Sequence, residues 1–128
     1  MARDSIIVQC PVVEKTQSIA NATVTKSDIT ASNGVVIKNA FKNKNNSLFI
    51  FVENTNDTDG TVTFKAGNFY PNAMLGDLET VVEAGSTSVL QIQDASRFEN
   101  KDGSINIDFS ADLVGQIYAV AKSVALNV

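Results

Sequence analysis

Apolar and polar residues alternate along most of this chain, and an alternation with a period of two predicts β-strands. The stretch SLFIFVEN is apolar at every position from Leu48 to Val52, so it predicts a strand that is buried on both faces. The stretch SINIDFS alternates strictly and predicts a strand whose Ile105, Ile107 and Phe109 side chains face the core. Further strands are expected in the stretches GTVTFKAG, STSVLQIQD, NATVTKSDI, GVVIKN and GQIYAVAKSVALNV.

Clusters of Asn, Asp and Gly separate the expected strands and indicate tight turns. They lie at Ser32–Gly34, Asn54–Gly60, Ala66–Gly67, Glu83–Ser86 and Lys101–Gly103. Short strands joined by frequent turns are typical of antiparallel all-β folds. We therefore expect an all-β fold, a single antiparallel β-sandwich or barrel of about seven to nine strands. The stretch DASRFEN allows one short helical turn, with Asp94 as its N-terminal cap.

The length of 128 residues corresponds to one domain that can bury a core of its own. Residues 1–13 are expected to form an extended N-terminal arm, and residues 14–128 a single β-sandwich domain. The run SIIVQ within the arm is apolar on successive residues, so it can add a strand to the edge of a neighbour's sheet. Ile6, Ile7 and Val8 are therefore candidate partner-binding residues.

The charge of the chain argues against nucleic acid as a partner, and the lack of a long apolar run argues against a membrane. Its net charge is −4 and its pI is about 4.6, whereas binding to phosphates needs a clustered basic face. Lys38, Lys42 and Lys44 form only a thin basic group, which we interpret as solvated surface. We expect no signal peptide and no transmembrane segment, because no stretch carries the apolar run that either requires.

The residue counts restrict the chemistry that the chain can perform. There is no histidine and one cysteine, Cys10, so catalytic triads, the usual zinc sites and an intramolecular disulfide are all excluded. Cys10 is interpreted as a structural residue. We expect no catalytic residues, no cofactor and no enzymatic activity.

Calcium binding and carboxylate catalysis are the remaining possibilities, and the spacing supports neither. An EF-hand loop built around Gly60 or Gly103 lacks the glutamate at its last position or the acidic residue at its first. Hairpin turns explain both loops, so we expect no metal site. No spacing singles out a pair among the candidate acids, which are Glu79, Glu83, Glu99, Asp102 and Asp108.

The stretch NFYPNAML is an apolar cluster inside a glycine-bounded loop. Two interpretations are open: the loop folds over the end of the sandwich, or it enters a partner subunit. Aromatic residues and methionine are enriched at protein interfaces. Phe69, Tyr70, Met74 and Leu75 are therefore further candidate partner-binding residues.

Beyond these local patterns, the string GTVTFKAG…GDLETVVEAGSTSVLQIQDASRFENKDGSINIDFS…GQIYAV resembles a family of small virion proteins of tailed bacteriophages and prophages. In that family a TVT…AG strand, a GDL…V.AG segment, a SARF…DG.INVDF segment and a closing G.I.A strand recur in this order. The resemblance extends from Gly60 to Val120, and it is looser in ITASNGVVIKN and LFIFVENT. The segment Asn68–Leu75 is the most individual part of the chain, so partner contacts there cannot be carried over from the resemblance.

The resemblance implies a structural role on the phage particle. We expect a capsid decoration protein that binds the lattice of the major capsid protein and stabilises the head. It would be made in the cytoplasm of the host bacterium and be located on the outer capsid surface of the virion, as a homo-oligomer for which a trimer is the first expectation. Two alternatives remain: a carbohydrate-binding surface module of the virion, and a structural protein of the tail or connector.

Overall fold

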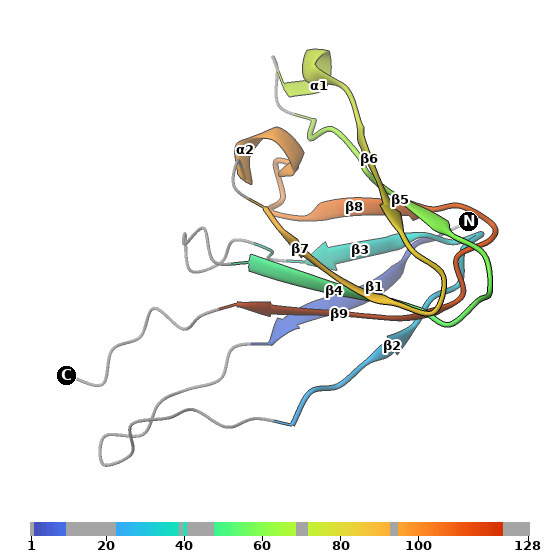
Figure 1. Cartoon of the computed structure of the whole chain (residues 1–128). Helices are drawn as coiled ribbons and strands as arrows, with labels where there is room; N and C mark the ends of the chain where they lie inside the picture. Colours follow the sequence, from blue (N-terminus) through green and yellow to red (C-terminus); the bar gives the residue numbers. More distant parts are fainter. Residues whose placement is uncertain are drawn as a thin grey trace.

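A computed structural model of the chain describes residues 2–9, 23–38, 40, 48–68, 72–92 and 95–121. Nine strands and two short helices make up this part of the chain (Figure 1). The strands are β1 (Asp4–Gln9), β2 (Ser27–Asp28), β3 (Val35–Lys38), β4 (Leu48–Asn54), β5 (Gly60–Phe64), β6 (Leu78–Val82), β7 (Thr87–Gln91), β8 (Ile105–Phe109) and β9 (Gly115–Ala121). The helices are α1 (Asn72–Leu75) and α2 (Ala95–Phe98).

The strands form one sheet that curls into a nearly closed barrel (Figure 1). The strand order is β6-β5-β8-β3-β1-β9-β4-β7, and β2 pairs with β9 outside this path. The pairs between described strands are antiparallel except for the two that β1 makes, with β3 and with β9. This architecture confirms the predicted all-β class and the predicted antiparallel sandwich or barrel.

Strand β1 joins two halves of the barrel, one made of β6, β5, β8 and β3 and the other of β9, β4 and β7. Its residues Asp4–Ile7 pair with β3, and its residues Val8–Gln9 pair with β9. Residues 4–9 of the expected arm therefore belong to the sheet, because this apolar run fills the position between two strands of its own domain. The predicted boundary at residue 13 lies outside the described part of the chain, as do residues 10–13.

The inward side chains of both halves form a single apolar core. Ile105, Ile107 and Phe109 on β8 are buried, which confirms their predicted orientation. Their register places Phe109 opposite Val62 and Ile107 opposite Phe64 on the neighbouring β5. The strict alternation of these strands explains why one of their faces is buried and the other faces solvent.

The outer face of β4 differs from the prediction of a strand buried on both sides. Its inner residues are buried, whereas Phe49 and Phe51 on its outer face are only half-buried. The alternation of apolar and polar residues also does not predict β6, because Val82 is the one fully buried residue of this strand. Both differences concern the surface of the barrel, which the following subsection describes.

Turns or bends lie within four of the five predicted segments, all except Ala66–Gly67, but the strands that they join do not pair with each other. Gly34, Gly85 and Gly103 have positive φ angles of 70°, 68° and 85°, a conformation that glycine adopts without steric cost. The stretch DASRFEN contains α2, the single helical turn that was expected, although Asp94 lies outside the described residues. Neither helix in the described ranges is long and apolar enough to cross a membrane.

Candidate functional site

The three partner-binding candidates on β1 have different environments. Ile6 is 6% exposed and belongs to the core, and Val8 is half-buried and packs against it. Ile7 points to the other side of the strand and is 71% exposed. The alternation of β1 thus separates these neighbouring residues, and Ile7 is the one that a partner can reach.

The candidates in the apolar loop are placed in part. Phe69 and Tyr70 lie outside the described residues. Met74 and Leu75 are 72% and 57% exposed on α1, which projects from one end of the barrel (Figure 1). The structure therefore leaves both of these described apolar side chains accessible to a partner.

The outer face of β4, β9 and β7 carries a row of apolar side chains, which we call the aromatic face. Its members are Phe49, Phe51, Val89, Tyr118 and Val120. The strand register places Phe51 between Val89 and Tyr118, and it pairs Phe49 with Val120. The Phe51 and Tyr118 rings stack with their centroids 4.9 Å apart and an interplanar angle of 6°. This arrangement gives the barrel an apolar outer surface in addition to its core.

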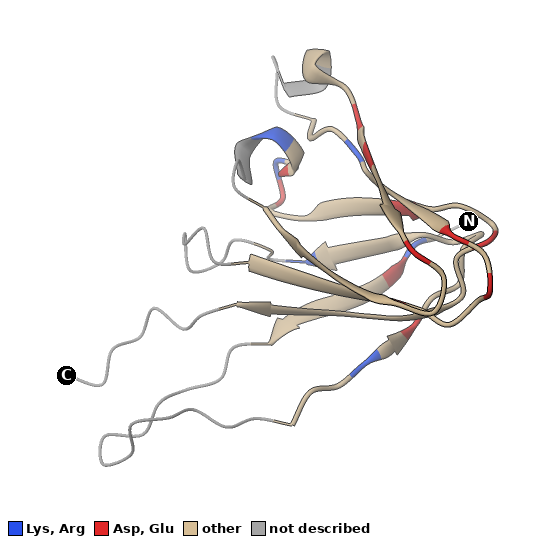
Figure 2. Cartoon of the chain, in the orientation of Figure 1, with Lys and Arg blue, Asp and Glu red and all other residues tan. Residues whose placement is uncertain are grey.

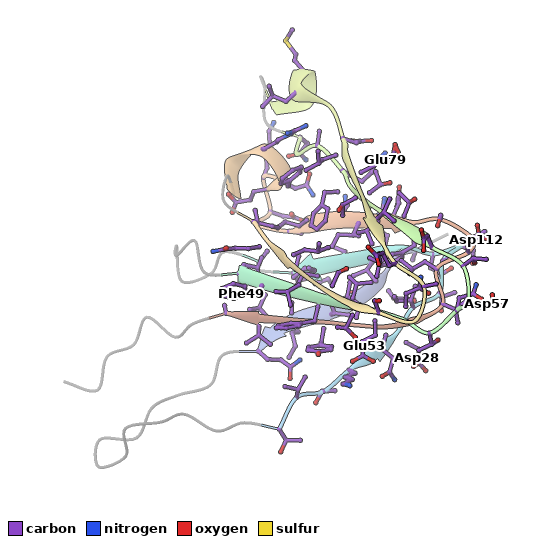
Figure 3. The ribbon with its side chains drawn as sticks, in the orientation of Figure 1. Asp28, Phe49, Glu53, Asp57, Glu79 and Asp112 are labelled. Carbon is purple, nitrogen blue, oxygen red and sulfur yellow. The ribbon has the colours of Figure 1, made fainter. Side chains whose placement is uncertain are left out.

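Charged side chains border the aromatic face. Lys26 Nζ lies 2.7 Å from Glu53 Oε2 and 5.5 Å from the centroid of the Tyr118 ring. The hydrogen bond to Glu53 raises the pKa of the Lys26 ammonium group above its ordinary value. Figure 3 shows Phe49 and Glu53 towards opposite ends of β4, so the surface changes from apolar to charged along one strand.

The outer face of the other half, which we call the charged face, carries a chain of ion pairs. Arg3 Nη1 pairs with Asp108 Oδ1, and Lys65 Nζ lies 3.9 Å from Asp108 Oδ2 and 2.7 Å from Asp77 Oδ2. The hydrogen bond from Lys65 lowers the pKa of the Asp77 carboxyl group, and Asp77 raises the pKa of Lys65. Acidic residues also lie along β6, as Figure 2 shows. The outer surface of this half is therefore charged and suited to contact with water.

The barrel is open between β6 and β7. These strands follow each other in the sequence but lie at opposite ends of the sheet order, and they diverge from the turn that joins them (Figure 1). The gap is a cleft of 430 Å³. The buried rings of Phe64 and Phe98, with centroids 5.6 Å apart, lie at its base. Leu78 and Val89, which are 45% and 55% exposed, line its sides.

The hydrogen-bond register shows which main-chain groups of β7 face this cleft. Asn54 N donates to Ser86 O at 2.9 Å, so Ser86 faces β4. Residues of an antiparallel strand alternate in the side to which their N–H and C=O groups point. The main-chain groups of Thr87, Val89 and Gln91 therefore point away from β4, towards the free edge.

The same reasoning applies to β6. Ser110 N donates to Thr61 O at 2.9 Å, so Thr61 on β5 faces β8 rather than β6. Val81 is the partner of Thr61 in the β5–β6 register, and its main-chain groups consequently point to the free edge, as do those of Glu79. The cleft is thus bordered by two rows of main-chain donors and acceptors.

Arg97 on α2 supplies a positive charge to the cleft. Its Nη2 donates to Leu75 O and Gly76 O at 3.3 and 3.4 Å, and its Cζ lies 5.2 Å from the centroid of the Phe98 ring. Its Nε is buried without a hydrogen-bond partner. None of the carboxylates that the structure describes forms an ion pair with Arg97.

Hydrogen bonds between side chains and the nearby main chain stabilise the loops Asn54–Gly60 and Lys101–Gly103. The buried Asn54 side chain donates to Thr58 O at 2.9 Å and accepts from Asn56 N at 3.1 Å, which closes the loop before Gly60. Asp102 accepts from Ser104 N and Oγ at 3.0 and 2.5 Å, and these bonds lower the pKa of its carboxyl group. Both loops are turns stabilised by their own hydrogen bonds, but the expectation of hairpins is wrong: Asn54–Gly60 connects β4 to β5, which do not pair with each other, and Lys101–Gly103 connects α2 to β8.

The candidate acids are distributed over the surface. Glu79, Glu83 and Asp102 are exposed, Glu99 is half-buried, and Asp108 is engaged with Arg3. In the described ranges no three Asp, Glu, Cys or His side chains come together as metal ligands would. The aromatic face and the cleft are therefore the candidate functional surfaces of the described part of the chain.

Neither surface is predicted from the sequence. The apolar residues on both faces of β4 are the available signal for the aromatic face, but their pattern predicts a strand that is buried on both sides. The cleft depends on the pairing of β5 with β6 and of β4 with β7, and no local pattern reports such pairing.

Comparisons with protein-family models, with curated proteins and with solved structures found no match for this chain.

Proposed function

We propose that this protein is a capsid decoration protein of a tailed bacteriophage, which binds the lattice of the major capsid protein and stabilises the head. It acts as a binding module rather than as an enzyme. A protein that binds the mature shell in preference to other states of the shell stabilises that state by mass action. The ordered motifs from Gly60 to Val120 that resemble small phage virion proteins support this proposal.

The observation that carries the proposal is the aromatic face. Its aromatic rings are half-buried and lie side by side on the outer surface of the sheet, so a partner surface can cover their remaining exposed area. Interfaces commonly have such an apolar centre with a polar rim, and Lys26 and Glu53 supply that rim here. The charged face, in contrast, is stable in water as it stands.

The arrangement around Tyr118 favours protein binding over glycan binding. A sugar stacks on the open face of an aromatic ring, but the Tyr118 ring already stacks on Phe51 and has Lys26 Nζ over it. The surface available to a partner is therefore a composite of several side chains rather than one exposed ring. Such a composite matches a protein surface better than a sugar ring.

The test compares two lysine substitutions on opposite faces of the barrel. Phe49→Lys places a charge in the aromatic face, and Thr63→Lys places the same charge between Glu79 and Asp108 on the charged face. Each purified variant is mixed with undecorated mature heads and with unexpanded proheads, and binding is measured by co-sedimentation. Circular dichroism of the free proteins checks that both variants fold.

We expect wild-type protein and Thr63→Lys to bind mature heads equally, and Phe49→Lys to bind at least about tenfold more weakly, because burying an unpaired charge is costly. Equal binding by a folded Phe49→Lys variant would exclude the aromatic face as the interface. Failure of the wild-type protein to bind either form of head would refute the decoration function itself.

A further inference from the structure

The cleft between β6 and β7 has the properties of a site for an extended polypeptide. We propose that it binds a segment of another protein in β-conformation, with apolar side chains at alternate positions and a carboxylate at the end that lies near Arg97. This inference concerns the cleft and not the aromatic face, so it goes beyond the proposed function and either one can fail alone.

The main-chain groups at the cleft favour a strand over a compact ligand. The N–H and C=O groups of Thr87, Val89 and Gln91 point to the free edge of β7, and those of Glu79 and Val81 point to the free edge of β6. An added strand pairs with such an edge through its main chain, whereas a small ligand cannot satisfy a row of alternating donors and acceptors.

The side chains of the cleft indicate the pattern of the bound segment. Successive residues of a strand point to opposite sides, so every second side chain of an added strand would point into the barrel. There it would contact Phe64, Phe98 and Leu90, which line the cleft on the core side. These positions of the segment should therefore be apolar, while the residues between them face solvent and tolerate polar side chains.

Arg97 determines the charge of the segment. Its guanidinium group lies in the lining of the cleft, and it pairs with no carboxylate in the described part of the chain. Its two hydrogen bonds to main-chain oxygens are long, at 3.3 and 3.4 Å, and its buried Nε has none. A carboxylate would form a charge-assisted hydrogen bond with this group, so an acidic residue is favoured at this end of the segment.

The experiment uses ¹⁵N-labelled full-length protein and blocked synthetic heptapeptides. Two probes of mirrored sequence, TVTVTVD and DVTVTVT, carry the acidic residue at either end, because the direction of the bound strand is open. In matched controls asparagine replaces the aspartate. In a third control, TPTPTVD, proline removes two main-chain donors and so prevents continuous pairing. Amide chemical shifts and hydrogen exchange are recorded at each titration point.

We expect one of the two acidic probes to bind with a dissociation constant on the order of 1 mM or tighter. The amide signals of Thr87, Val89 and Gln91 should shift, and their hydrogen exchange should slow. The asparagine probe should bind roughly three- to tenfold more weakly, and the Arg97→Gln variant should lose this preference. The proline probe should not bind.

Two variants locate the site. Gln91→Pro removes a main-chain donor that faces the cleft while leaving the hydrogen bonds to β4 in place, and Gln91 is not part of the aromatic face, so the variant should fold but not bind. If Gln91→Pro does not fold, Gln91→Lys tests the same edge, because a lysine on an edge strand opposes strand addition. Thr63→Lys, on the charged face, is the control and should bind as the wild-type protein does.

Three outcomes would overturn the inference. They are unchanged β7 amide signals with both acidic probes at millimolar concentration, equal binding of the proline probe, and shifts that map to Phe49, Tyr118 and Val120 instead of to β7. Equal affinity for aspartate and asparagine probes would remove the role assigned to Arg97. Head binding does not enter this test, so its result is independent of the decoration proposal.

Discussion

The two halves of the barrel are built alike on the inside and differently on the outside. Beneath the aromatic face the inner residues Ile50 and Ile117 are fully buried, and beneath the charged face Ile37 and Ile107 are equally buried. Outside, one half presents the stacked Phe51 and Tyr118 rings, and the other presents the ion pairs around Asp108.

This difference separates what the fold requires from what it merely permits. Burial of one face of each strand is sufficient to stabilise a barrel, and the charged face shows that polar outer residues are compatible with this sheet. The aromatic residues on the other outer face are therefore not demanded by the architecture. A binding function gives them a reason, since apolar surface that folding leaves half-exposed can be buried by a partner.

The largest effect should come from the core that both halves share. Ile50→Ala lies beneath the aromatic face and Ile107→Ala beneath the charged face, and each should lower the free energy of unfolding by about 2–5 kcal/mol. Both residues are 0% exposed, so each substitution leaves a cavity. Chemical denaturation monitored by circular dichroism measures the loss. A large loss in one variant and none in the other would mean that the halves do not share a cooperative core.

The fold could be predicted wherever burial on one face alone decides the pattern. Strand β8 alternates strictly and was identified with its correct orientation, and β5 next to it alternates in the same way. Strand β6 could not be identified, because four of its five residues are exposed or half-buried. The run that forms β1 was recognised as extended, but its pairing with β3 and β9 is a long-range property that no local pattern encodes.

The sequence predicts some individual exposed residues, but it does not predict the surfaces that such residues form together. Ile7, Met74 and Leu75 were proposed as contacts and are exposed, whereas Ile6 was proposed and is buried. The period of two contains the information that Ile6 and Ile7 face opposite sides, but it does not say which side is the core. Arg97 gave no signal in the sequence, because its relation to the cleft depends on how the chain closes.

The next effect concerns the stacked rings of the aromatic face. Phe51→Ala removes the stack on Tyr118 and part of the half-buried apolar surface, so we expect the free energy of unfolding to fall by about 1–2 kcal/mol. Thr63→Ala, at a corresponding outward position of the charged face, should change it by less than about 0.5 kcal/mol. Denaturation curves of the two variants give the comparison directly. Equal losses would mean that the aromatic row is no more important to the free protein than the polar one.

A smaller effect is expected from the charged face, and it depends on pH. The pKa of Asp77 is lowered by Lys65, so the pair stabilises the fold above the ordinary carboxyl value of 3.8, and this contribution is lost as the pH falls through the lower value of the folded state. Because both side chains are 38% exposed, Asp77→Asn should cost at most about 1 kcal/mol at pH 7.

The pH dependence of this variant is its sharper property. The difference in stability between wild-type protein and Asp77→Asn should disappear in strong acid, and it should shrink at high salt concentration. The pKa of Lys65 is raised, so its contribution is present below 10.5 and is lost only at still higher pH. Melting temperatures recorded from acid to neutral pH test both statements. A difference that persists at the lowest pH would mean that the effect does not come from the charge of Asp77, since asparagine can still accept the hydrogen bond from Ala66 N.

The smallest effect should come from Lys26 at the rim of the aromatic face. Its raised pKa keeps it charged throughout the neutral range, so Lys26→Met should leave the melting temperature and its dependence on pH unchanged between pH 5 and 9, within about one degree. Binding to heads should stay within about threefold of the wild-type value, with a weaker dependence on salt, because rim charges influence the rate of association more than the affinity. Co-sedimentation at two salt concentrations measures both quantities. A loss of binding as large as that expected for Phe49→Lys would reverse the assignment, because the charged rim would then carry the interaction and the aromatic rings would only support it.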